Sequence, residues 1–114
     1  MGMIDLDVTI WCEYHDGSKE PLLFIETARD VGQSWKTAVV TQRIGECSGR
    51  PAFTVLYKPN RDETDIEAFR VQRRYPNPTD KWTSMDPKEY AIFLLGWRQK
   101  MVRKLGLREA ECEV

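Results

Sequence analysis

The stretch PLLFIETARD, residues 21–30, decides the fold of this chain. Its four apolar residues at positions 22–25 show no alternation with polar side chains, which is typical of a strand that is covered on both faces. We therefore expect a strand here in the centre of a sheet. The apolar run stops at Glu26, so the sequence places one carboxylate at the end of this strand.

The segment before it, MIDLDVTIWCEY at residues 3–14, alternates between apolar and polar side chains. A period of two residues is typical of a strand with two unlike faces. Turn-forming residues separate the two runs and include Asp16-Gly17, a strong hairpin signal. The sequence thus predicts an antiparallel hairpin.

The segment after it changes to a helical period. A stripe spaced for one face of a helix ends before Gly49 and consists of Trp35, Ala38, Val39 and Gln42. The next run, PAFTVLY at residues 51–57, is apolar and rich in strand-forming residues. A strand, a helix and a strand in this order favour a crossover that sets this run parallel to residues 22–25.

The last third of the chain predicts one more strand and a long helix. IEAFRVQRRY, residues 66–75, alternates and is expected to form an antiparallel edge strand. Asp86, Pro87 and Glu89 form the pattern of a capping box, so a helix is expected to begin here and to end near Gly106. Its core-facing stripe is Tyr90, Phe93, Leu94, Trp97 and Met101.

These elements predict one α/β (α+β) domain over residues 1–114, with a single mixed four-stranded sheet in β-β-α-β-β-α order. A chain of 114 residues with 41% hydrophobic residues is long enough for one core and too short for two. Residues 109–114 contain three acids and are expected to form a flexible acidic tail.

Composition also bounds the location of the protein. No apolar run approaches the ~20 residues that span a bilayer, and the first residues do not resemble a signal peptide. Cys12, Cys47 and Cys112 are odd in number and widely separated, which supports neither a disulfide framework nor a zinc site. We expect a soluble protein with reduced thiols in the cytoplasm.

The net charge of −1 conceals a basic second half. Residues 70–108 contain ten Lys or Arg and three Asp or Glu. Four of these cations are expected to point outward from the last helix: Arg98, Lys100, Arg103 and Lys104. They could bind nucleic-acid phosphates, with DNA favoured, or they could form a solvated face that complements the dipole at the helix C-terminus.

Three acids are candidates for a metal site. Asp5 and Asp7 share one face of the first strand, and Glu26 ends the second. Carboxylates that converge repel one another unless a cation lies between them, and Mg²⁺ is commonly held by one or two carboxylates plus water. The alternative is that all three are exposed charges that keep strand ends soluble.

The order of these features resembles the PD-(D/E)XK restriction-endonuclease-like superfamily. The resemblance covers roughly residues 4–98 and extends to small phage-encoded members with a strand-end Ile-Glu-x-Lys element and a helix like EYAIFLL, residues 89–95. If a phage encodes the protein, we expect it in the host cytoplasm. It implies a restriction-endonuclease-like core in which Asp5 or Asp7 and Glu26 bind Mg²⁺. It also implies a lysine that activates the attacking water, and Ala28 occupies that position.

The alanine leaves three alternatives. The role of the lysine could have moved to Lys36 or Arg29, the site could bind metal without cutting, or the fold could serve as a binding surface. With Glu26 and Lys36 as the catalytic candidates, the expectation is a nuclease-like nucleic-acid-binding protein. Its Mg²⁺-dependent phosphodiester hydrolysis is expected to be weak or absent, because Ala28 occupies the position of the lysine. The alternative is a small non-enzymatic protein-interaction module, such as a phage factor that binds a host or phage protein.

Overall fold

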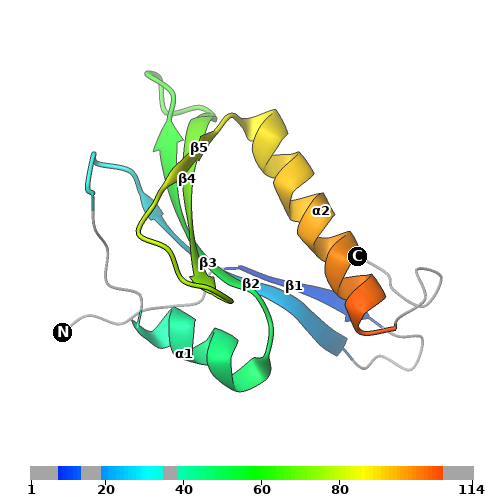
Figure 1. The fold of residues 1–114 in the computed structure, drawn as a ribbon. Helices are drawn as coiled ribbons and strands as arrows, with labels where there is room; N and C mark the ends of the chain where they lie inside the picture. The colour runs from blue at the N-terminus through cyan, green and yellow to red at the C-terminus, as the bar shows by residue number, and fades with distance from the viewer. Residues whose placement is uncertain (1–7, 14–18, 35–38, 107–114) are drawn as a thin grey trace.

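The computed structural model describes residues 8–13, 19–34 and 39–106. Within them one mixed sheet of five strands has the order β1-β2-β3-β4-β5, with β2 and β3 parallel and the other neighbours antiparallel (Figure 1). The elements in chain order are β1 (Val8–Glu13), β2 (Lys19–Arg29), α1 (Val39–Ser48), β3 (Ala52–Pro59), β4 (Ile66–Tyr75), β5 (Thr83–Met85) and α2 (Pro87–Lys104).

The α/β class, the antiparallel pairing of β1 with β2 and the parallel pairing of β2 with β3 are confirmed. The predicted number of four strands is wrong, because β5 adds a fifth strand beside β4. For the same reason β4 is not an edge strand. β5 has three residues, which is too short to show a periodic pattern in the sequence. The predicted turn at Asp16-Gly17 and the acidic tail at residues 109–114 lie outside the described residues.

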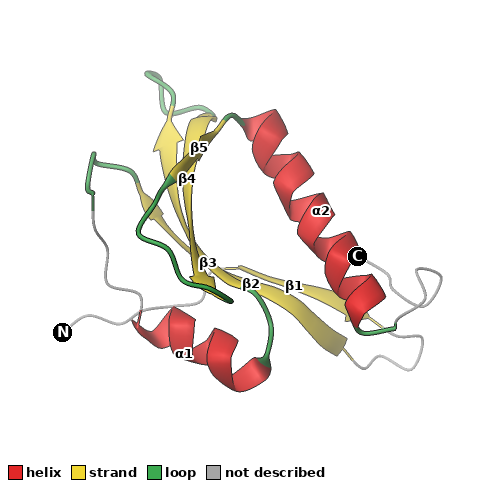
Figure 2. Cartoon of the chain, in the orientation of Figure 1, coloured by secondary structure: helices red, strands yellow, loops and turns green. Residues whose placement is uncertain are grey.

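The two helices lie on opposite faces of the sheet (Figure 2). Helix α2 covers the apolar face, where Ile25, Phe53 and Val71 are buried together with Met101 from the helix. The predicted apolar stripe of α2 is confirmed, since its five members are packed in or against this core. Two of its rings meet Phe53 edge-on, at centroid distances of 5.1 Å for Phe93 and 5.3 Å for Trp97.

Helix α2 begins as its sequence predicts. The side chain of Asp86 accepts a hydrogen bond from the backbone N–H of Glu89, and the Glu89 side chain accepts one from the backbone N–H of Asp86. This reciprocal pair satisfies two donors that a helix N-terminus leaves open. Leu105 ends the helix and Gly106 follows with a φ of 69°, a conformation that favours glycine.

Helix α1 packs on the other face through Thr41 and Gly45, which are its buried residues. The helix that the sequence predicts before Gly49 is confirmed, but Val39 of its predicted stripe is 53% exposed and Gln42 is only half-buried. Gly45 allows the close approach, because a Cβ there would lie 2.5 Å from the Cβ of Tyr75 on β4. Trp35 and Ala38, the other apolar members of the predicted stripe, lie outside the described residues.

Candidate functional site

Glu26 lies inside β2 and not at its end, because the strand continues to Arg29. The prediction of a strand-end carboxylate is thus wrong. Glu26 is 2% exposed and pairs in register with Thr54 of β3, on the sheet face that α1 covers. A carboxylate that is removed from water in this way needs hydrogen-bond donors or a cation beside it.

Both kinds of partner are present around Glu26. The Thr41 hydroxyl of α1 donates a hydrogen bond to its Oε2 at 2.6 Å. Arg74 of β4 interacts electrostatically with Glu26, and the Arg74 Nε donates to the Thr54 hydroxyl at 2.9 Å. Burial lowers the pKa of Arg74 below its usual value, and the negative charge of Glu26 opposes this change. Glu26 and Arg74 therefore form a polar centre, together with Thr41 and Thr54, between α1 and the sheet.

This neighbourhood favours a structural role for Glu26 over that of a metal ligand. A guanidinium nearby disfavours a second cation, and no group of three or more His, Cys, Asp or Glu in the described part of the chain could hold one. Asp5, Asp7 and Lys36 lie outside the described residues, so the Mg²⁺ prediction stays a prediction.

The structure describes Ala28 and Arg29, the two remaining positions that bear on the missing lysine. Ala28 lies on the same face as Glu26, opposite Leu56 of β3. Arg29, one candidate for the role of the lysine, forms an ion pair with Glu63 in the loop between β3 and β4. The Arg29 guanidinium thus points to a different partner from the Glu26 carboxylate.

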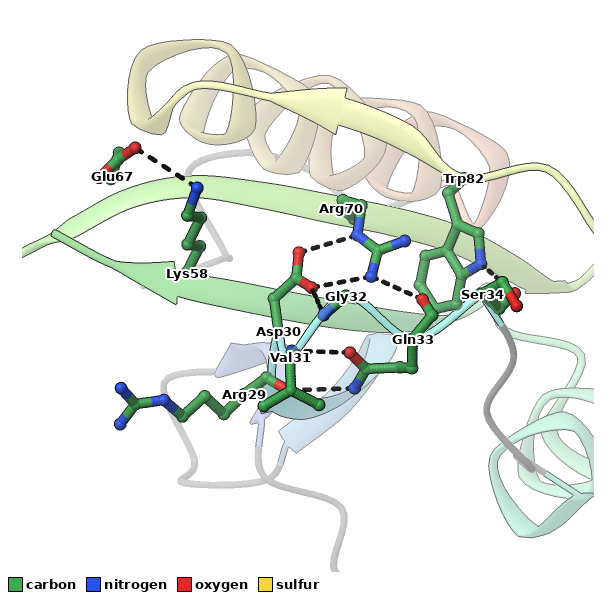
Figure 3. A network of polar contacts seen from close by, with 10 residues as sticks. All are labelled: Arg29, Asp30, Val31, Gly32, Gln33, Ser34, Lys58, Glu67, Arg70 and Trp82. Carbon is green, nitrogen blue, oxygen red and sulfur yellow. Dashed lines mark hydrogen bonds and ion pairs between the residues drawn. The ribbon is translucent and has the colours of Figure 1, made fainter.

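A second polar network follows the end of β2 and was not predicted. Arg70 of β4 holds Asp30 through two hydrogen bonds of 2.8 Å, and its Nη2 donates to the backbone oxygen of Gln33 (Figure 3). The guanidinium lies 5.2 Å from the ring centroid of Trp82, whose indole N–H donates to the backbone oxygen of Ser34. These contacts fix the segment after β2 against β4.

The Arg70 guanidinium holds the pKa of Asp30 below its usual value. Because the pKa is lower in the folded state, the ionised carboxylate stabilises the fold at neutral pH. This contribution is lost as the pH falls from about 5 through the folded-state pKa. We expect Asp30→Asn to cost about 1–2 kcal/mol at pH 7 and to flatten the acid limb of the stability profile, measured by urea unfolding. An unchanged slope below about pH 5 would contradict this role.

Cations gather on the face that α2 covers, around two cavities. One cavity of about 200 Å³ lies between α2 and the β4–β5 connection and has Arg73 and Lys81 in its wall. The other, of about 150 Å³, has Arg73, Lys100 and Lys104 in its wall. Arg73 and Trp97 line both cavities, so the two are neighbours. No Asp or Glu among the described residues lines either of them.

The structure brings together two of the four residues predicted to bind nucleic acid. Lys100 and Lys104 line the smaller cavity, and Arg103 is exposed in the last turn of α2. Arg98 is half-buried and its Nε is shielded from solvent, which does not agree with the expectation that it points outward. Arg73 joins the lysines from β4, because it pairs with Phe53 and shares the face of α2. From the sequence, the alternation along β4 indicates that Arg73 and Arg74 point to opposite faces of the sheet. It does not indicate which of these two faces α2 covers.

Comparisons with family models, with curated proteins and with solved structures find no match to this chain. None of the helices that the structure describes is long and apolar enough to cross a membrane.

Proposed function

We propose that the protein binds nucleic acid through the cations around Trp97. The observation that carries the proposal is that β4, the β4–β5 connection and α2 bring Arg73, Lys81 and two lysines to neighbouring cavities. None of the described residues in the walls of these cavities is an Asp or Glu. Such a surface has a local positive charge although the whole chain has a net charge of −1. Its complement is a ligand with several negative charges in a row, and a phosphate backbone has this chemistry.

The resemblance to PD-(D/E)XK nucleases supports the same class of ligand, with DNA favoured. Hydrolysis is not part of the proposal. Ala28 offers no charge or hydrogen bond to a water, and Glu26 is buried with Thr41 and Arg74. The function proposed is thus that of a nuclease-like protein that holds nucleic acid without a cleavage step of its own.

Replacing Lys100 and Lys104 with alanine tests the proposal. Each phosphate that a cation neutralises releases counterions, so log K falls in proportion to log salt, with a slope of about 0.7–0.9 per phosphate. We expect the double variant to bind more weakly and to lower this slope by about 1.4–1.8 units, measured by fluorescence anisotropy with labelled DNA between low and physiological salt. The expected change in the free energy of unfolding is within about 0.5 kcal/mol per residue, because both side chains are exposed.

A matched control removes two cations elsewhere. Lys58 and Arg61 are exposed at the end of β3 and in the loop that follows it, far along the sheet from the last turns of α2 (Figure 1). Lys58→Ala with Arg61→Ala is expected to leave the salt slope unchanged. Equal losses in the two double variants would show non-specific attraction, and no binding at low salt would refute the proposal.

One observation favours the protein-interaction alternative. Ile92 and Leu95 of α2 are 62% and 56% exposed, and Ile92 borders a third cavity of about 260 Å³ with Trp97 and Lys100. Large exposed apolar side chains next to a hollow are typical of surfaces that bind other proteins. If no nucleic acid binds at low salt, this surface becomes the preferred candidate for function.

A further inference from the structure

The Trp97 ring lies among the cations and borders three cavities. It lines the two cationic cavities and also the third cavity beside Ile92, so space borders it on more than one side. The ring is half-buried and is held from the core by the edge-on contact with Phe53. A rigid aromatic ring next to open space and among cations can stack a flat ligand group while the cations bind its charges.

The cavities are small, at about 150–260 Å³, compared with the 300–1,000 Å³ or so of typical small-molecule sites. They suit one flat group each and not a whole large ligand. A double helix keeps its bases stacked inside and offers phosphates alone, unless energy is spent to unstack a base. A single strand offers unpaired bases and phosphates together, which matches a tryptophan surrounded by cations.

Lys100 shows that this ring accepts a partner on its face. Its Nζ lies 4.6 Å from the Trp97 ring centroid as a cation–π contact. Lys100 is exposed, and such a contact at an exposed site contributes less than the stacking of a base. A base can therefore replace the ammonium on the ring, and Lys100 can then pair with a neighbouring phosphate.

We propose that the ligand is single-stranded nucleic acid and that Trp97 stacks one of its unpaired bases. Arg73 lies between the two cationic cavities and binds the phosphate next to that base. Lys81 continues the phosphate path on one side, and Lys100 with Lys104 continues it on the other. This inference rests on the proposed function and adds to it the form of the nucleic acid and the residue that recognises a base.

The test compares three labelled ligands at one salt concentration. They are a thymidine oligomer of about 15 nucleotides, an abasic oligomer with the same number of phosphates, and a duplex of the same length. We expect the thymidine oligomer to bind roughly tenfold more tightly than the abasic one, because only the former can stack, and also more tightly than the duplex. This comparison uses the unmodified protein, so it does not depend on how a variant folds.

Trp97→Leu is expected to lower the affinity for the thymidine oligomer to that for the abasic oligomer. Its affinity for the abasic oligomer is expected to stay within about twofold of that of the unmodified protein. Trp82→Leu is the matched control, since Trp82 contacts Arg70 and Ser34 and lines neither cationic cavity. It should keep the preference for thymidine. If Trp97→Leu does not fold, Trp97→Phe retains a ring against Phe53 and is expected to lose part of the preference.

The outcomes separate this inference from the proposed function. Equal, salt-dependent binding of the thymidine and abasic oligomers would overturn base stacking and leave phosphate binding in place. Tighter binding of the duplex would overturn the preference for single strands. No binding of any of the three ligands at low salt would overturn both proposals.

Discussion

Replacing Glu26 with alanine is expected to lower the free energy of unfolding by about 2–4 kcal/mol. The substitution removes the acceptor of the Thr41 hydroxyl and the negative charge that favours ionised Arg74. It also leaves a gap under α1, because Glu26 is among the largest fully buried side chains. Removing one partner of a buried charged interaction lowers the free energy of unfolding strongly, because the charge of the other partner stays buried without an opposite charge beside it.

Two further variants separate the charge from the shape. Glu26→Gln keeps the size and one acceptor oxygen for Thr41, so it is expected to cost less, about 1–2 kcal/mol. Glu67→Ala is the control, because Glu67 forms an exposed ion pair of 3.8 Å with Lys58 and is expected to contribute less than about 1 kcal/mol. Urea unfolding at pH 7 measures all three.

The result also bears on the Mg²⁺ prediction. In the metal-free protein, a carboxylate that serves as a metal ligand is repelled by the other acidic ligands. Its removal therefore often leaves the free energy of unfolding unchanged or raises it. Removing a carboxylate that has a structural role lowers the free energy of unfolding. If Glu26→Ala is as stable as the unmodified protein, the structural role is wrong and the metal-ligand interpretation gains support.

Most of the fold could be predicted because its signals are local. The apolar run at residues 22–25, the change to a helical period after it and the capping box at Asp86 each depend on a few neighbouring residues. The end of β2 was missed for a physical reason. Thr27, Ala28 and Arg29 continue the strand by pairing with β3, and nothing in their polarity distinguishes them from a loop.

The candidate site could be predicted less well, because it depends on distant parts of the chain. Lys100 and Lys104 were predicted from their spacing on one helix, whereas Arg73 and Lys81 join them only when the β4–β5 connection lies beside α2. The burial of Glu26 depends on Thr41, fifteen residues later, and Arg74, on a strand that is not its neighbour. A run of basic residues thus suggested the class of ligand that we propose, but it did not indicate the cavities.

Replacing Gly45 with alanine is expected to lower the free energy of unfolding by about 1–2 kcal/mol, although alanine is the better helix former. The added Cβ would lie 2.5 Å from the Cβ of Tyr75 and 3.1 Å from that of Ala52, so α1 must move away from the sheet. Overpacking costs about 1–3 kcal/mol, and a contact of 2.5 Å belongs in the upper part of this range. A cost of about 2–3 kcal/mol less the gain of about 1 kcal/mol in helix propensity leaves a net loss of about 1–2 kcal/mol. Thr41, one turn earlier on α1, would shift with the helix and weaken its hydrogen bond to Glu26.

The same substitution at Gly96 should have the opposite sign. A Cβ at this position of α2 meets nothing within 4 Å, so only the higher helix propensity of alanine changes the stability. Gly96→Ala should therefore raise the free energy of unfolding by about 0.5–1 kcal/mol. Thermal and urea unfolding of the two variants beside the unmodified protein measure both changes. If both variants gain stability, α1 lies farther from β4 than the contact at Tyr75 requires.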